Sequence, residues 1–150
     1  MRNFLLLLVL LISGIMAFSQ PAKTMYGPVV KEKFHFNRPG NQDTVGGYTQ
    51  AIRVGNSIYV SGTVSADKSE KGVAQVYNVI SRTLEHFGVG PQHVVKEGLF
   101  TTDIEAMKAL NHVRKNWYKG DFPASTWLQI SRLYMPDAWL EVEVVAVLPD

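Results

Sequence analysis

Two glutamates near the end of the chain, Glu141 and Glu143, are the side chains best suited to acid–base chemistry. They stand in an apolar, β-branched run, residues 139–148, that is predicted to form a strand. Residues two apart in a strand share one face, with Cα atoms roughly 6.5–7 Å apart, so both carboxylates point the same way. One interpretation is a pair of solvated charges on an exposed strand. The other is a cleft carboxylate that holds a water molecule, with its pKa raised by partial burial.

A second stretch, residues 46–62, combines a turn signal with small residues. Two strand-like runs, residues 48–54 and 57–64, flank Gly55-Asn56, and such a pair predicts a tight hairpin. The second run contains Ser61-Gly62, where the lack of a side chain lets the backbone approach a ligand closely.

These two stretches resemble the signatures of the RidA/YjgF family of reactive-intermediate imine deaminases. That family shows GPYSQA, a hairpin and VSG, then E-h-E-A-h-A near the C-terminus, where h is hydrophobic. This chain has GGYTQA, VSG and EVEVVA, with Gly47 where the family usually has proline. The resemblance covers most of the chain, from about Tyr48 to the C-terminus.

The resemblance implies a role for several residues. The family acid that orients the hydrolytic water corresponds to Glu141, and Glu143 corresponds to a structural position at the subunit boundary. The implied ligand-facing positions on the hairpin side are Tyr48, Ser61 and Gly62.

The chain departs from the family in the run Pro123–Trp127, PASTW. Active deaminases carry P-A-R-[ST]-[CA], and their arginine clamps the carboxylate of the substrate. Here Ser125 takes the place of the arginine, Thr126 follows, and Trp127 takes the place of the small residue. Serine offers one neutral donor instead of a charged fork, so the expected substrate is not a simple 2-imino acid. Trp127 is either an aromatic wall of the ligand site or a subunit contact.

Two more positions bear on the implied site. Asn111 corresponds to the asparagine of a family pattern V-N-x-x-Y, which here is Leu110–Arg114, LNHVR. The implied role is ligand contact, and the alternative is a bond to a neighbouring loop. No other arginine is obviously placed to replace the lost one, since Arg132 lies too far along its strand from Ser125.

Hydrophobic periodicity predicts the elements that position these residues. Expected strands are residues 29–36 at a sheet edge, the hairpin, 94–101 with a bulge at Gly98, 124–133 and 139–148; expected helices are 73–87 and 103–118, the latter capped by Asp103. Their order predicts an α+β fold, a mixed β-sheet with two helices packed on one face.

The other face of that sheet is expected to need a cover. It would carry Trp139, Val145 and Val147, or their even-numbered neighbours, and is too apolar to be left in water. Oligomerisation is the simplest cover. The resemblance agrees, because it implies a chorismate-mutase-like fold and a homotrimer with ligand clefts between subunits.

Composition excludes several classes of function. The chain has 150 residues, 46% hydrophobic and 19% charged, as expected for one globular domain. It has no cysteine, which excludes disulfides, thiol nucleophiles and thiolate metal sites. Its four histidines lack metal-binding spacing, so no metal or cofactor is expected. The net charge of +2 gives no footprint for nucleic acid, and a small molecule is the expected partner.

The N-terminal residues predict export. Arg2 precedes the apolar run Phe4–Ile12, which is too short to span a bilayer, and small neutral residues follow. We therefore expect a signal peptide over residues 1–19, with a cut after Ala17 or an uncleaved anchor as alternatives. The mature protein would be periplasmic or secreted, without stable membrane association. Residues 20–45 would form an N-terminal extension and residues 46–150 the RidA-like domain.

Two functions remain open. One is hydrolysis, and so deamination, of a small imine or enamine by water held on Glu141 in intersubunit clefts. The other is a non-catalytic trimer that binds a small ligand in the same clefts. Ribonuclease activity, sometimes attached to the family, is disfavoured by the near-neutral charge and by export.

Overall fold

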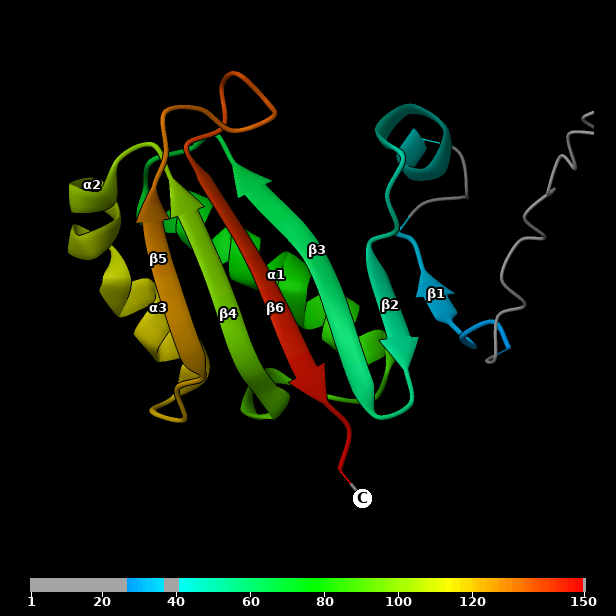
Figure 1. The fold of residues 1–150 in the computed structure, drawn as a ribbon. Coiled ribbons are helices and arrows are strands. Elements are labelled where there is room, and N and C mark those ends of the chain that lie inside the picture. The colour runs from blue at the N-terminus through cyan, green and yellow to red at the C-terminus, as the bar shows by residue number, and fades with distance from the viewer. Residues whose placement is uncertain (1–26, 37–40, 150) are drawn as a thin grey trace, which may run out of the picture.

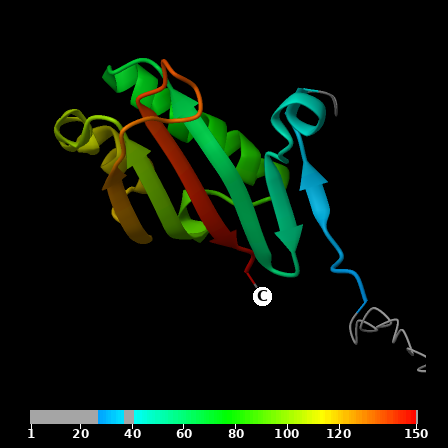
Figure 2. The same ribbon diagram turned by 45° about the horizontal axis from the view of Figure 1, so that its top comes forward.

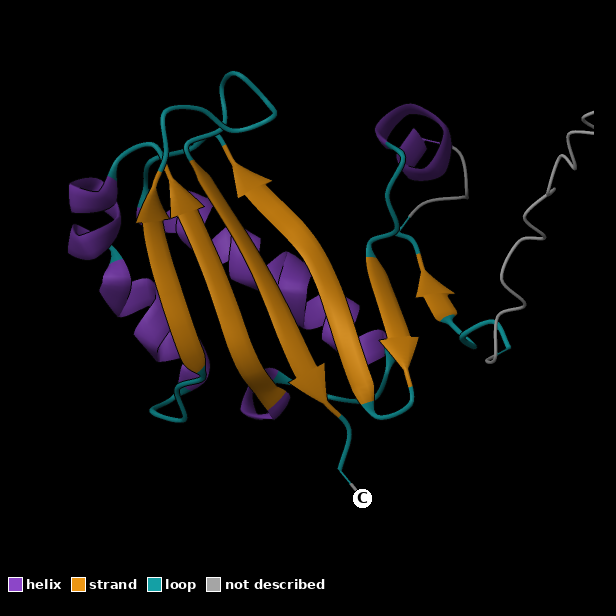
Figure 3. Ribbon diagram, in the orientation of Figure 1, coloured by secondary structure: helices purple, strands orange, loops and turns teal. Residues whose placement is uncertain are grey.

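The computed structural model describes residues 27–36 and 41–149. Its six-stranded sheet has the order β1-β2-β3-β6-β4-β5, and all neighbours are antiparallel except the parallel pair β4 and β5. The helices lie on one face of this sheet, as Figures 1 and 2 show. The strands are β1 (Glu32–Phe34), β2 (Ala51–Val54), β3 (Ser57–Ser65), β4 (Val94–Thr101), β5 (Ala124–Gln129) and β6 (Leu140–Val147). The helices are α1 (Glu70–His86), α2 (Ile104–Ala109) and α3 (Asn111–Tyr118), with short helical turns at Asn41–Gly46 and Pro91–His93 (Figure 3).

The predicted α+β architecture is confirmed, and so is the hairpin. Val54 pairs with Ser57 across the two-residue turn, and Gly55 has the positive φ of 58° that such a turn requires. The predicted edge strand is present as the shorter β1, which pairs with β2.

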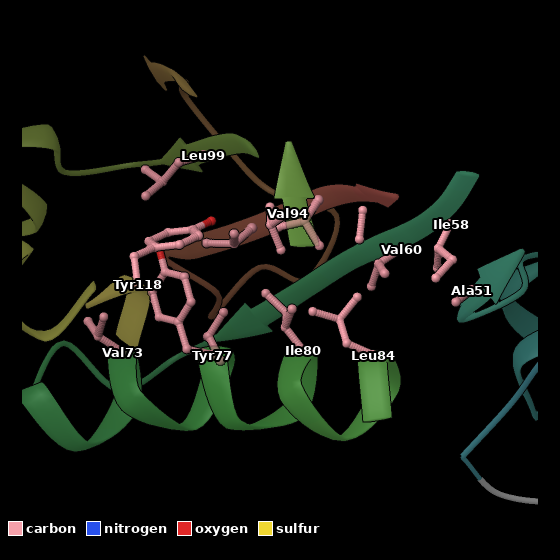
Figure 4. Close-up of a cluster of buried hydrophobic side chains, with 14 of the residues drawn as sticks. Ala51, Ile58, Val60, Val73, Tyr77, Ile80, Leu84, Val94, Leu99 and Tyr118 are labelled. Carbon is pink, nitrogen blue, oxygen red and sulfur yellow. The ribbon is translucent and has the colours of Figure 1, made fainter. Parts of the chain in front are cut away.

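The core lies between the sheet and α1, which presents the predicted apolar stripe. Val73, Tyr77, Ile80 and Leu84 are buried against the helix-facing side of the sheet, as Figure 4 shows. Each such side chain contributes roughly 1.5–3 kcal/mol of burial free energy. The helix begins at Glu70, three residues earlier than expected from the stripe, because the hydroxyl of Ser69 caps it by accepting from the Gly72 N–H at 3.4 Å.

The prediction of one helix over residues 103–118 was wrong in one respect. Asp103 does cap its start, accepting from the Ala106 N–H at 3.1 Å. The helix then breaks at Leu110, whose φ of −93° and ψ of 4° end α2 and begin α3. The broken helix delivers Arg114 and Tyr118 from α3 to the sheet, where both are buried.

The strands also differ from expectation in detail. The irregularity in β4 lies at Val95, where the register shifts between Val94 and Lys96, and not at Gly98, which is paired on both sides. β5 ends at Gln129 instead of residue 133, and the chain turns away after Ile130 donates its N–H to the Thr101 carbonyl.

The face of the sheet opposite the helices is open in the single chain. Odd-numbered residues of β6, from Glu141 to Val147, point to this open face, while even-numbered residues point to the core. Large apolar side chains remain exposed there, with Tyr59 at 51% and Leu128 at 49%. Val145 and Val147 lie on this face as expected, but the expectation was wrong for Trp139. The Trp139 ring is buried before β6 begins, and its indole N–H donates to the Asp67 carbonyl at 2.8 Å.

Candidate functional site

A pocket of about 390 Å³ lies on the open face, between β3, β6 and the loop that precedes β6. Four of its lining residues were expected in the site from the sequence: Tyr48, Ser61, Gly62 and Glu141. The remaining lining residues are Gly46, Val64, Tyr134 and Met135. The structure therefore brings the predicted hairpin residues and the predicted acid together.

A bulge in β3 creates the room for the acid. The pairing of β3 with β6 shifts between Val60 and Thr63, so Ser61 and Gly62 fall outside the regular ladder. The Glu141 carboxylate lies directly over Gly62, where a Cβ atom would overlap it. Ser61 fixes the bulge, because its hydroxyl donates to the Thr49 carbonyl at 2.6 Å. Glycine is needed here for close approach and not for an unusual backbone angle.

The surroundings of Glu141 change the pKa of its carboxyl group. Burial raises its pKa above the ordinary value, and the neighbouring carboxylate of Glu143 raises it further. Among the described residues, no hydrogen bond or ion pair engages the carboxylate. A half-buried, unpartnered carboxylate in a pocket can hold a water molecule and exchange protons with it.

Tyr48 is held at the pocket rim by its local backbone. Its hydroxyl accepts from Gln42 Nε2 at 3.3 Å, and its backbone N–H donates to the Gln42 carbonyl at 3.0 Å. The preceding Gly47 has a φ of 66°, which a proline ring cannot adopt. A proline at position 47 would therefore not fit the backbone conformation that leads to Tyr48 in this chain.

The other predicted residues of the β5 side lie elsewhere. Ser125 and Trp127 point to the helix face of the sheet, opposite to Glu141 in the same chain. Thr126 points to the open face and accepts from Lys96 Nζ at 3.0 Å. Asn111 begins α3, and its side-chain oxygen is buried without a hydrogen-bond partner in the described part of the chain. Within one chain, the sheet separates the pocket from Ser125 and Trp127.

Ser125 belongs to a buried polar network around Glu97 that the sequence reasoning missed. The Glu97 carboxylate is fully buried and accepts from Tyr77 at 2.9 Å, Tyr118 at 3.0 Å, Arg114 at 2.7 Å and Ser125 at 2.7 Å. The indole N–H of Trp127 donates to the Ser125 hydroxyl at 3.0 Å. The sequence did carry a signal for this network. Glu97 is a charged residue in the predicted strand 94–101, and Arg114 is a charged residue in the apolar stripe of the predicted second helix.

The network also determines what Arg114 can do. Its side chain is only 8% exposed and is held by Glu97. The guanidinium lies over the rings of Tyr118 and Trp127, at 4.9 and 5.4 Å from their centroids. An arginine therefore does stand near Ser125, but an internal carboxylate already occupies it.

We expect Gly62→Ala to alter Glu141 more than it alters the fold. The new Cβ would push the carboxylate toward solvent, so the pKa of Glu141 should fall toward its ordinary value. An NMR titration of the carboxyl group measures this. Gly27→Ala is the control, since no atom lies within 4 Å of the place that its new Cβ would take. An unchanged or higher pKa would show that Gly62 does not set the position of the acid.

Two kinds of feature are absent from the described residues. None of the helices in residues 27–36 and 41–149 is long and apolar enough to cross a membrane. The same residues contain no group of three or more side chains arranged to hold a metal ion.

Comparison with known proteins identifies the family. The endoribonuclease L-PSP family matches residues 38–148. A human protein named 2-iminobutanoate/2-iminopropanoate deaminase is 30% identical over 112 residues, which cover 69% of this chain and 81% of the human one. A RutC family protein from Aquifex aeolicus is 27% identical, covering 69% of this chain and 90% of the relative.

Solved structures agree. A member of the conserved Rid protein family from Yersinia pestis aligns with a TM-score of 0.69 at 28% identity, covering 79% of this chain and all of its own. A YjgF-family protein from Mycobacterium tuberculosis shares the fold, with a TM-score of 0.71 at 19% identity over 79% of this chain and 100% of the other. The resemblance seen in the sequence is thereby confirmed, and the chain belongs to the endoribonuclease L-PSP family, the RidA/YjgF group of proteins.

Proposed function

We propose that this protein hydrolyses a small imine or enamine that carries no carboxylate beside the reacting carbon, and that Glu141 is its acid–base group. The observation that carries the proposal is the half-buried Glu141 carboxylate over Gly62, which no described residue pairs with, in a pocket of about 390 Å³. Pockets of this size suit small ligands. The relative named 2-iminobutanoate/2-iminopropanoate deaminase supports the reaction class.

The chemistry needs one acid–base group. Glu141 accepts a proton from water as the water oxygen bonds to the carbon of the protonated imine, and the C=N double bond becomes a single bond. Glu141 then returns the proton to the nitrogen of the adduct, and it accepts the hydroxyl proton as the C–N bond breaks and the C=O double bond forms. A carbonyl compound and an amine or ammonia leave, and Glu141 releases this last proton to solvent. A carboxyl group whose pKa is raised by burial is a stronger base than an ordinary carboxylate, and it can both accept and return a proton.

The limit on the substrate follows from Ser125 and Arg114. The Ser125 hydroxyl donates to Glu97, and the Arg114 guanidinium is paired with the same carboxylate. Neither group is free to clamp a substrate carboxylate as the family arginine does. A charge-assisted hydrogen bond is worth about 1.5–3 kcal/mol. Without it, the binding of 2-imino acids should be severely weakened.

Assembly is part of the proposal. The open sheet face carries Tyr59, Val145 and Leu128, and a homotrimer of the family type would cover such a face. Clefts between subunits would then lie along the open face that carries Glu141, and not on the helix face to which Ser125 and Trp127 point. Sedimentation of the full-length protein would distinguish a trimer from a single chain.

We further propose export, because residues 1–19 have the sequence pattern of a signal peptide. Those residues lie outside the described part of the structure. Cleavage after Ser19 would leave Gln20 as the first residue of a periplasmic or secreted protein, which N-terminal sequencing of the mature protein would establish.

We do not propose action on RNA, although the family description names an endoribonuclease. The net charge is only +2, and the charged side chain that lines the pocket is a carboxylate, which repels phosphate.

The proposal is tested with benzaldehyde methylimine, a preformed imine without a carboxylate whose hydrolysis is followed by ultraviolet absorbance. The protein should accelerate hydrolysis above the rate in buffer, in proportion to its concentration. If no acceleration is found with this or smaller carboxylate-free imines, the proposal fails and a non-catalytic ligand-binding protein takes its place.

We expect Glu143→Gln to move the pH dependence of this hydrolysis. The Glu143 charge raises the pKa of Glu141, so removing it should lower that pKa. The base form of Glu141 then persists to lower pH. The acidic limb of the plot of kcat/KM against pH should therefore shift to lower pH. The same substrate titrates in both proteins, so the difference reports on the enzyme. Glu105→Gln, on the exposed part of α2, should leave the limb in place; a shift to higher pH in Glu143→Gln would contradict the assignment.

A further inference from the structure

The pocket on the open face has one kind of charge. Glu141 is the acidic side chain among its lining residues, and Glu143 lies two residues along β6 on the same face. Glu143 packs against Gly98, where an added Cβ would come within 2.9 Å of its Oε1 atom. Two carboxylates thus lie on the same face of β6, with Glu141 in the pocket and Glu143 next to it.

These carboxylates differ from Glu97 in how they are satisfied. Glu97 accepts from four donors, including a guanidinium. No hydrogen bond or ion pair to Glu141 or Glu143 is present among the described residues. A half-buried carboxylate that the fold leaves without a donor is available to one brought by a ligand.

The nearest cations are already engaged or lie outside the pocket. Arg114 is buried against Glu97 on the other face of the sheet. Lys96 lies outside the pocket, in a separate hollow that it lines together with Glu143, and its Nζ donates to the Thr126 hydroxyl at 3.0 Å. Arg132 lines an adjoining hollow on the loop before β6 and not the pocket itself.

The uncharged part of the pocket also suits a cation. Tyr48 and Tyr134 present aromatic rings, 44% and 86% exposed, and Met135 adds a polarisable thioether. Aromatic faces attract ammonium groups through the ring quadrupole.

We infer that the ligand of this pocket is a small organic cation, a protonated imine or the related primary ammonium compound, held by Glu141 with Glu143 in support. The inference deepens the proposed function and rests on it for the identity of the site. Imines without a carboxylate become net cations on protonation, and the protonated form is the one that water attacks. Relatives named 2-iminobutanoate deaminase act, by that name, on a substrate that carries a carboxylate. Here the preference for charge is reversed.

The test compares three ligands of one shape: propylammonium, propanamide and propanoate. Binding to the full-length assembled protein is measured by calorimetric titration at constant ionic strength. Propylammonium should bind at least about tenfold more tightly than propanoate, with propanamide between them. Glu141→Gln should abolish the preference and Glu143→Gln should reduce it. Glu105→Gln, a matched change at an exposed glutamate paired with Lys108, should leave it intact.

The outcomes separate the inference from the proposed function. Equal or tighter binding of propanoate, or no binding of propylammonium, would overturn the inference even if imines are hydrolysed. A cation preference that depends on Glu141, without any imine hydrolysis, would support the inference and refute the enzyme. If Glu141→Gln fails to fold, Glu143→Gln and the salt dependence of propylammonium binding in the wild type decide: both must weaken binding.

Discussion

Replacing Glu97 with glutamine is expected to lower the free energy of unfolding by about 3–5 kcal/mol, the typical cost of removing one partner of a buried ion pair. The change keeps the volume of the side chain and removes its charge. Arg114, only 8% exposed, would then be a buried cation without an anion. Tyr77, Tyr118 and Ser125 would also lose the carboxylate that accepts their hydroxyls. Denaturant unfolding measures the loss.

Two further variants control this result. Glu105→Gln breaks the exposed Lys108 pair at 2.7 Å and should cost under about 1 kcal/mol, because solvent screens surface pairs. Glu97→Gln combined with Arg114→Met removes both charges and should be more stable than Glu97→Gln alone. If Glu97→Gln alone is as stable as the wild type, the network does not hold β4, β5 and α3 together.

Replacing Glu141 with glutamine is expected to reduce imine hydrolysis by about 10²–10⁴-fold, the usual contribution of a positioned general acid–base group. Stability should change little, because Glu141 has no described polar partner to lose and sits half-exposed on β6. The rate of benzaldehyde methylimine hydrolysis and the midpoint of thermal unfolding measure the two effects separately.

The matched variant is Glu143→Gln, which changes a carboxylate on the same strand and face. It should retain most of kcat at pH values where Glu141 is ionised, while KM rises because Glu143 supports binding of the cationic substrate. If kcat falls equally in the two variants, or falls in neither, Glu141 does not have the role assigned to it.

Local patterns predicted most of the fold. The hairpin followed from Gly55-Asn56, and the stripe of α1 followed from apolar residues three and four apart. The bounds of β4 were also predicted. These features depend on residues close in sequence, whose periodicity is visible without the tertiary structure.

The failures come from long-range packing. The break at Leu110 lies inside a good helical pattern, and it serves to bring Arg114 to a carboxylate 17 positions earlier in the chain. The bulge in β4 depends on how β6 pairs with it, so glycine content pointed to Gly98 instead of Val95. The periodicity of the sequence predicts neither the helix break nor the bulge.

The candidate site was predicted in part for the same reason. Glu141 and Gly62 meet because β3 and β6 are neighbours, an arrangement that the family resemblance implied. The face on which Ser125 lies was not predicted, since strand periodicity fixes alternation but not phase at an edge strand. The Glu97 network could not be foreseen, because its members come from α1, β4, α3 and β5.

The central claim, hydrolysis of imines without a carboxylate, is tested most directly by comparing two substrates that differ in one group. These are 2-iminobutane and 2-iminobutanoate, each generated in place by oxidation of the corresponding amine. The structure predicts a higher kcat/KM for 2-iminobutane, by at least about tenfold, because neither Ser125 nor Arg114 is free to bind a carboxylate. A kcat/KM for 2-iminobutanoate equal to or above that for 2-iminobutane would contradict the account.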